Sequence, residues 1–171
     1  MAVSEKSEQG IARAGFAEDV GAKRSYKTFT ILPSKLRADH FSDNHDRAAV
    51  YSLASEMPEL AGHPAFADDR FCFRRTEVMT RVVSFQAVGQ EQPIKAYRSN
   101  THQADVAAGF LRHAAALYLE VTGKLAECPD MREGLMVVAA EQPKTPLAAM
   151  DKNRAENERL DSGSPLNRAW V

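Results

Sequence analysis

Residues 70–98 read RFCFRRTEVMTRVVSFQAVGQEQPIKAYR, and the fold predicted for the chain depends on this stretch. It is rich in β-branched and aromatic residues, which favour strands. Apolar and polar side chains alternate over 70–75, a longer β-rich run covers 77–88, and 93–98 follows a turn that contains glycine. The stretch therefore predicts three consecutive strands of a mostly antiparallel sheet.

Further elements flank this predicted sheet on both sides. The segment 26–32, YKTFTIL, predicts a strand that stops at a proline. Residues 42–57 predict a helix with acidic residues in its first turn, where the helix dipole favours them, and Pro58 ends it. Residues 100–122 predict a longer amphipathic helix, and Gly123 suits the left-handed position beyond its end.

The order of these elements predicts an α+β fold with a single domain. We expect a three- to four-stranded, mostly antiparallel sheet packed by two main helices, with an extra C-terminal helix and flexible ends. We divide the chain into a flexible N-terminal segment at 1–24, an α+β core domain at 25–142, and a C-terminal helix and tail at 143–171. The short apolar run 134–140 fits a strand or a helix, and 147–160 predicts the extra helix.

The composition excludes several classes of protein. Apolar residues make up 44% and charged residues 26% of the 171 residues, as in a soluble globular domain. The net charge of -1 excludes a polybasic protein and a strongly acidic disordered one. No apolar run is long enough for a secretory signal or a membrane span.

The cysteines and the amino-acid composition indicate the cellular compartment and the type of genome. Cys72 and Cys128 lack zinc-type spacing, and we expect two small buried side chains in a reducing cytoplasm. The 27 alanines, and the excess of 14 arginines over 8 lysines, are typical of a GC-rich bacterial or phage genome. The sequence therefore predicts a cytoplasmic protein encoded by a bacterium, a phage or a plasmid.

Charge is distributed unevenly along the chain. Residues 70–124 contain eight Lys or Arg and four Asp or Glu, a balance of +4, so the remainder carries -5. Arginine binds phosphate through its planar fork, and aromatic rings stack on unpaired bases. The candidate nucleic-acid or anion-binding residues on the predicted sheet are Arg70, Arg74, Arg75, Arg81, Lys95, Tyr97 and Arg98. Two alternatives stay open: a solvated face whose arginines pair with the acidic flanks, and a surface for an anionic protein.

Two groups of histidines could carry chemistry. Residues 39–46 read DHFSDNHD, and imidazole and carboxylate groups are good ligands for zinc or a transition metal. The metal ligands under this alternative are His40, Asp43, His45 and Asp46. The other histidines, His63, His102 and His113, are candidate general bases, with His113 at the edge of the polar face of the long helix.

Three hypotheses about function follow. The first is a small non-catalytic accessory protein that binds a protein or nucleoprotein assembly, with a basic sheet face meeting an anionic surface, RNA or DNA among the options. Trp170 and Val171 would dock on the partner, because tryptophan is a strong interface anchor. The second is a metal-assisted hydrolase that uses the cluster at 39–46. The third is a purely protein-binding inhibitor or structural subunit. No nucleophile or phosphate-loop motif is present, so we expect neither an enzyme of those classes nor a cofactor.

Overall fold

The computed structural model of the chain describes residues 27–39, 50–98, 104–141, 144–145 and 148. The strands among them are β1 (Thr28–Ile31), β2 (Leu36–Arg37), β3 (Tyr51–Ser52), β4 (Arg70–Phe71), β5 (Ile94–Arg98), β6 (Ala104–Ala108) and β7 (Leu135–Ala140). The helices among them are α1 (Leu53–Glu56), α2 (Arg75–Val88) and α3 (Phe110–Val121), with short 3₁₀ turns η1 (Pro33–Lys35) and η2 (Leu125–Glu127).

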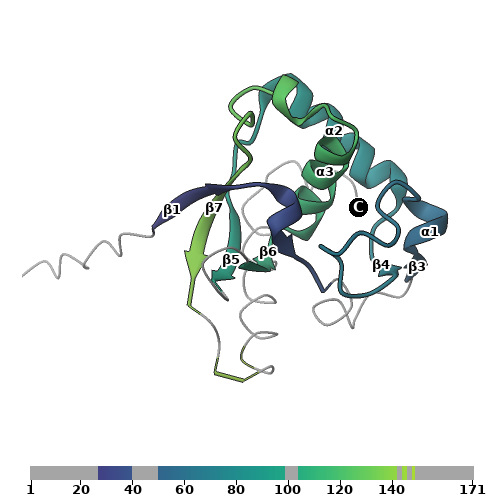
Figure 1. Cartoon of the computed structure of the whole chain (residues 1–171), viewed down its shortest axis with the longest axis horizontal. Helices are drawn as coiled ribbons and strands as arrows, with labels where there is room; N and C mark the ends of the chain where they lie inside the picture. Colours follow the sequence, from purple (N-terminus) through teal and green to yellow (C-terminus); the bar gives the residue numbers. More distant parts are fainter. Residues whose placement is uncertain (1–26, 40–49, 99–103, 142–143, 146–147, 149–171) are drawn as a thin grey trace, which may run out of the picture.

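The α+β class predicted from the sequence is confirmed, but the sheet differs from the expectation. It has five strands in the order β1-β7-β5-β6-β2, and β3 pairs with β4 in a separate two-stranded sheet (Figure 1). Strands β1 and β7, and β5 and β6, are antiparallel, whereas β5 runs parallel to β7 and β2 runs parallel to β6. The sheet is therefore mixed rather than mostly antiparallel.

Helix α2 is the main correction to the predicted fold, because the strand expected over 77–88 is wrong. The side chains of Val78, Val82 and Phe85 are buried, and this spacing places them on one face of a helix. At the helix start, the backbone N–H of Arg74 donates to the Glu77 carboxylate at 2.6 Å, as in a capping box. Burial of one helical face and a satisfied N-terminus therefore override the strand preference of the β-branched residues.

Strand β6 divides the long helix that was predicted over 100–122. Residues 104–108 are extended and pair with β5, and α3 begins only at Phe110. Gly109 between them has a φ of +96°, a left-handed conformation that other residues rarely adopt. The end of the helix is as predicted, because Gly123 has a φ of +73° directly beyond it.

The remaining expectations are met in part. Strands β1 and β5 lie within the segments 26–32 and 93–98, as predicted, and β7 shows that the run 134–140, which fitted a strand or a helix, is a strand. Of the helix predicted over 42–57, only the short α1 is present, and residues 40–49 lie outside the description. Of the strand expected over 70–75, only the first two residues form a strand, β4. The predicted helix over 147–160 lies outside the described residues except for position 148.

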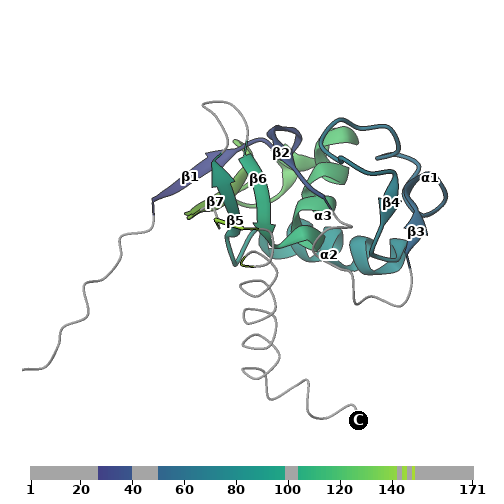
Figure 2. The same cartoon turned by 90° about the horizontal axis from the view of Figure 1, so that it is seen from below.

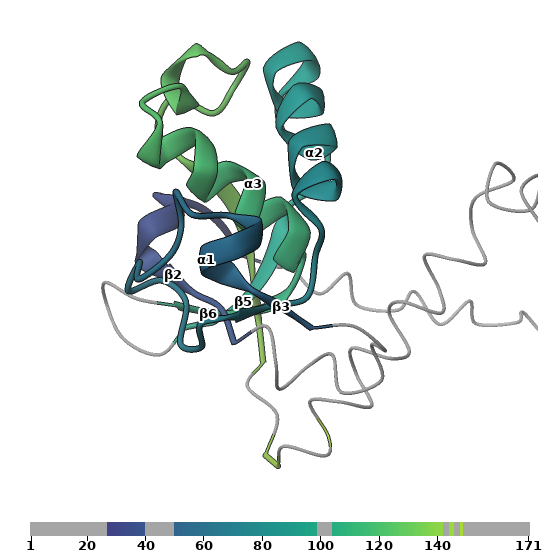
Figure 3. The same ribbon diagram turned by 90° about the vertical axis from the view of Figure 1, so that its right-hand side faces the viewer.

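Helix α3 is the centre of the hydrophobic core. Figure 2 shows α3 between the five-stranded sheet and the smaller unit of α1, β3 and β4, and Figure 3 shows α2 beside it. Its residues Ala114, Ala115, Ala116 and Leu117 are all 0% exposed. Three consecutive alanines let the surrounding elements approach the helix closely. Cys72 and Cys128 are buried and form no disulfide, as predicted. Within the described segments, no helix combines the length and apolar character needed to cross a membrane.

Candidate anion-binding site

The basic residues singled out in the sequence do not share one sheet face. Arg70 is in β4, Arg74 and Arg75 are at the start of α2, and Arg81 is in the middle of that helix. Lys95, Tyr97 and Arg98 belong to β5, on the other side of the chain turn, and the side chain of Arg98 lies outside the description. The predicted placement on a sheet is wrong for 75–88 because these residues form a helix.

Arg70 is held by a carboxylate close to it in the sequence. Its Nε donates to Asp68 Oδ1 at 2.9 Å, and its backbone N–H donates to the same oxygen at 2.7 Å. These hydrogen bonds lower the pKa of Asp68 to about 2, the side-chain bond from Arg70 being the largest cause. The guanidinium of Arg70 is therefore already paired with a full negative charge.

Arg74 and Arg75 are held by two glutamates from the turn region around α1. Arg74 donates to Glu56 at 2.9 Å, and its guanidinium lies 3.7 Å from the centre of the Tyr51 ring. Arg75 donates to both carboxylate oxygens of Glu59, at 2.7 and 2.6 Å, and this hydrogen bonding lowers the pKa of Glu59. For these two arginines and Arg70, the structure shows the alternative in which basic residues pair with acids outside 70–124.

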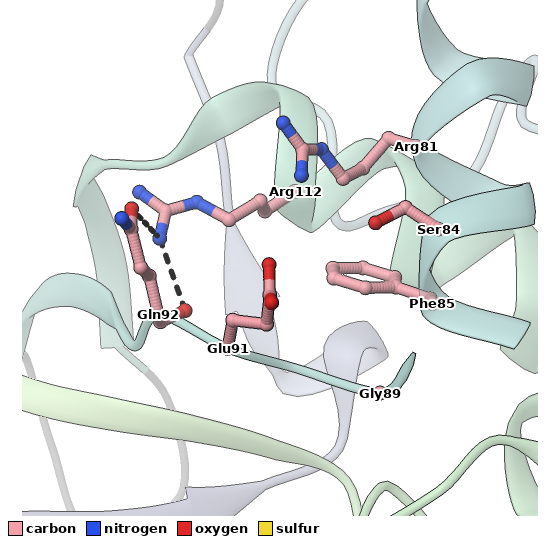
Figure 4. A pocket seen from close by; sticks show the side chains of 7 residues that line it. All are labelled: Arg81, Ser84, Phe85, Gly89, Glu91, Gln92 and Arg112. Carbon is pink, nitrogen blue, oxygen red and sulfur yellow. Dashed lines mark hydrogen bonds between the residues drawn. The ribbon is translucent and has the colours of Figure 1, made fainter. Parts of the chain in front are cut away.

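Arg81 has a different environment, because it lines a pocket with a second arginine. The pocket has a volume of about 200 Å³ and lies where α2, the loop before β5 and the first turn of α3 meet (Figure 4). Its lining residues are Arg81, Ser84, Phe85, Gly89, Glu91, Gln92 and Arg112. Within the described part of the chain, no hydrogen bond or ion pair joins the side chain of Arg81 to another residue.

Arg112 is fixed in this pocket by backbone carbonyl groups. Its Nη1 donates to Gln92 O at 3.0 Å and to Pro93 O at 3.1 Å (Figure 4 draws the first of these bonds). These bonds attach the start of α3 to the loop before β5 and orient the guanidinium. Arg112 is one of the eight basic residues of 70–124, but it is not among the candidate site residues predicted from the sequence. Only the packing of α2 on α3 brings it near Arg81.

Gly89 shapes the other end of the pocket. It ends α2 with a φ of +72°, and a Cβ built on it would lie 2.2 Å from Pro129 O. No side chain fits in that space without movement of the backbone, so a glycine is required here. The tight turn directs residues 90–93 back along α2, and Glu91 and Gln92 thereby enter the pocket lining.

Lys95 and Tyr97 lie elsewhere, on the face of β5 opposite to the buried Ile94 and Ala96. Tyr97 lines a second pocket of about 300 Å³. This pocket is formed by Arg37, Ala38, Asp39, Ala67, Tyr97, Asp105 and Val106. With two carboxylates against one guanidinium, and that guanidinium 3.9 Å from Asp105, the second pocket does not favour an anion.

The candidate general base His113 is buried, so its predicted position at the edge of the polar face of the long helix is wrong. Its side chain is 0% exposed and its Nε2 donates to Pro33 O at 3.0 Å. Burial lowers its pKa to about 4, which keeps the ring neutral near pH 7. His63 is half-buried, and its Nδ1 accepts a hydrogen bond from the Ala65 backbone at 3.1 Å. His102 lies outside the described residues.

The other candidate sites fall on parts of the chain that the structure does not describe. His40, Asp43, His45 and Asp46 lie in the undescribed segment 40–49. Trp170 and Val171 lie in the undescribed segment 149–171. Among the residues that the structure does describe, no group of three or more His, Cys, Asp or Glu side chains could hold a metal ion.

Comparisons with known proteins leave the chain without a family. No protein-family model matches it, and no curated protein matches it. Among solved structures it is similar to the C-terminally truncated chromosome-partitioning protein ParB from Caulobacter crescentus complexed with CTP-γ-S, at 15% sequence identity and a TM-score of 0.47. The match covers 78% of this chain and 53% of that one, so the chain spans about half the length of the ParB chain. A likeness at this level assigns no ligand, partner or activity to the chain.

Proposed function

We propose that the protein is a small non-catalytic accessory protein that binds an anionic group of a protein or nucleoprotein partner through Arg81 and Arg112. The observation that carries the proposal is that both arginines line one pocket, in which the side chain of Arg81 has no hydrogen-bond or ion-pair partner among the described residues. Arginine side chains suit phosphate oxygens, because each guanidinium presents several N–H donors in a fixed plane. The hydroxyl of Ser84 adds a further donor to the same lining.

The arginines that already pair with carboxylates contribute less to anion binding under this proposal. Arg70, Arg74 and Arg75 each face a carboxylate, so a partner phosphate would have to compete with Asp68, Glu56 or Glu59. Arg81 faces no such competitor within hydrogen-bonding distance in the described part of the chain. The contributions of Lys95, Tyr97 and Arg98 to nucleic-acid binding stay predictions.

A charge-reversal series on a polyanion column tests the proposal. Arg81→Glu is compared with Arg132→Glu, which makes the same change in net charge at an exposed arginine that does not line the pocket. We expect Arg81→Glu to elute at clearly lower salt than Arg132→Glu, because phosphate contacts weaken steeply with salt.

Two results contradict the proposal. The first is an equal shift for both variants, which would mean that net charge alone sets retention. The second is elution of the natural sequence that does not depend on salt, which would favour a purely protein-binding subunit.

A further inference from the structure

Glu91 places a negative charge inside the pocket that Arg81 and Arg112 line. Figure 4 shows its carboxylate pointing into the pocket, between the guanidinium groups and the ring of Phe85. No hydrogen bond or ion pair joins the side chain of Glu91 to another of the described residues. The carboxylate thus lines the same pocket as two guanidinium groups and forms an ion pair with neither.

This arrangement divides the pocket into two parts of opposite character. One part, with Arg81, Arg112 and the Ser84 hydroxyl, offers N–H and O–H donors to an anion. The other part, with the carboxylate of Glu91, offers an anion, which attracts a cation. A ligand that is only an anion would be attracted by the first part and repelled by Glu91.

We propose that the pocket selects a phosphate monoester that carries an ammonium group a few bonds from the phosphate, with Glu91 as the selectivity residue. The phosphate lies against Arg81 and Arg112, and the ammonium group donates to the Glu91 carboxylate. The inference rests on the proposed function, because it requires the two arginines to bind an anion.

The size of the pocket supports a small group rather than an extended surface. Its volume is about 200 Å³. On this measure one water molecule needs about 10–15 Å³, so the pocket has room for a phosphate group with further atoms attached.

A comparison of two soluble phosphate monoesters shows whether the pocket selects for the ammonium group or only attracts negative charge. O-Phosphoethanolamine carries the ammonium group, and methyl phosphate lacks it. At pH 7.5 both phosphates are mostly dianions, since the second pKa is about 6. Charge attraction alone therefore favours methyl phosphate, whose net charge is about twice as negative. Binding is measured by amide chemical-shift titration of the full chain.

We expect the natural sequence to bind O-phosphoethanolamine about fourfold more tightly than methyl phosphate, as for one solvent-exposed ion pair. Glu91→Gln should reverse the preference, and Glu133→Gln should keep it. Glu133 is the matched control, because it is exposed and does not line the pocket. The amide spectrum of each variant also shows whether it is folded.

Failure of this inference can be told apart from failure of the proposed function. Equal or tighter binding of methyl phosphate by the natural sequence, or no binding of either ester, overturns the selectivity. If retention on the polyanion column still depends on Arg81, the proposed function stands. Binding of phosphatidylethanolamine vesicles without binding of the soluble ester also contradicts the inference, since the phosphate of the lipid is a diester.

Discussion

The imidazole of His113 lies wholly inside the core. Its Nε2 donates to Pro33 O at 3.0 Å, the Phe66 ring centre is 5.6 Å away, and Nδ1 has no partner in the described part of the chain. His63 is the other titratable group that acts on it, and like burial it lowers the pKa of His113. Its burial and its hydrogen bond to Pro33 in η1 make His113 a structural residue rather than a general base.

Acid should destabilise the fold through His113. The folded-state pKa is about 4 against an ordinary value of 6.5, so above pH 6.5 the ring is neutral in both states and imposes no cost. Below pH 6.5 the unfolded chain takes up a proton that the folded chain excludes. We expect the free energy of unfolding to fall by about 1.4 kcal/mol per pH unit down to about pH 4, a total of about 3 kcal/mol.

Urea unfolding between pH 4 and 7.5 measures this effect. His113→Leu should show a shallower pH dependence than the natural sequence, whatever its stability at pH 7.5. His63→Gln is the control and should keep most of the slope. Parallel pH profiles for the natural sequence and His113→Leu would show that His113 is not the group responsible.

Because α2 is a helix, the neighbouring residues Val82 and Val83 differ in burial. Val82 is 3% exposed and Val83 is 62% exposed, because Val82 shares the buried face of the helix with Val78 and Phe85. We expect Val82→Ala to lower the free energy of unfolding by about 2 kcal/mol through lost burial and a cavity. Val83→Ala should change it by less than about 0.5 kcal/mol, because alanine is also the better helix former. Chemical denaturation of both variants measures these changes. A larger loss for Val83→Ala than for Val82→Ala would contradict a helix at this position.

The turn that ends α2 is expected to be less tolerant than the turn that ends α3. Gly89 and Gly123 have φ values of +72° and +73°, so alanine is strained at both. A Cβ at Gly123 meets nothing within 4 Å, whereas one at Gly89 lies 2.2 Å from Pro129 O. Gly123→Ala should cost about 1 kcal/mol, and Gly89→Ala clearly more, since the backbone has to move. Equal losses of stability for the two variants in thermal unfolding would mean that the backbone at Pro129 moves at little cost.

For the molecule as a whole, the sequence was informative where structure is local. Strand β5 and the glycine after α3 follow from patterns of neighbouring residues, and so does the α+β class. Helix α2 was missed because Val78, Val82 and Phe85 bury a helical face only when α3 packs against it. Gly109, which separates β6 from α3, resembles any other glycine in the sequence.

The candidate site was predicted less well than the fold. The charge count located the basic part of the chain, and three of its arginines turned out to be paired with Asp68, Glu56 and Glu59. Arg81 and Arg112 come together only through contact between helices, and such contacts between distant positions cannot be read from spacing. The pocket therefore became visible only in three dimensions.

The salt dependence of binding tests the central claim most directly. Affinity for a labelled single-stranded oligonucleotide is measured by fluorescence anisotropy over a range of salt for the natural sequence, Arg81→Gln and Arg132→Gln. If Arg81 contacts a phosphate, Arg81→Gln should reduce the slope of log affinity against log salt by about 0.7, the value for one contact to a single strand. Arg132→Gln should leave the slope unchanged. An unchanged slope in Arg81→Gln would contradict the account.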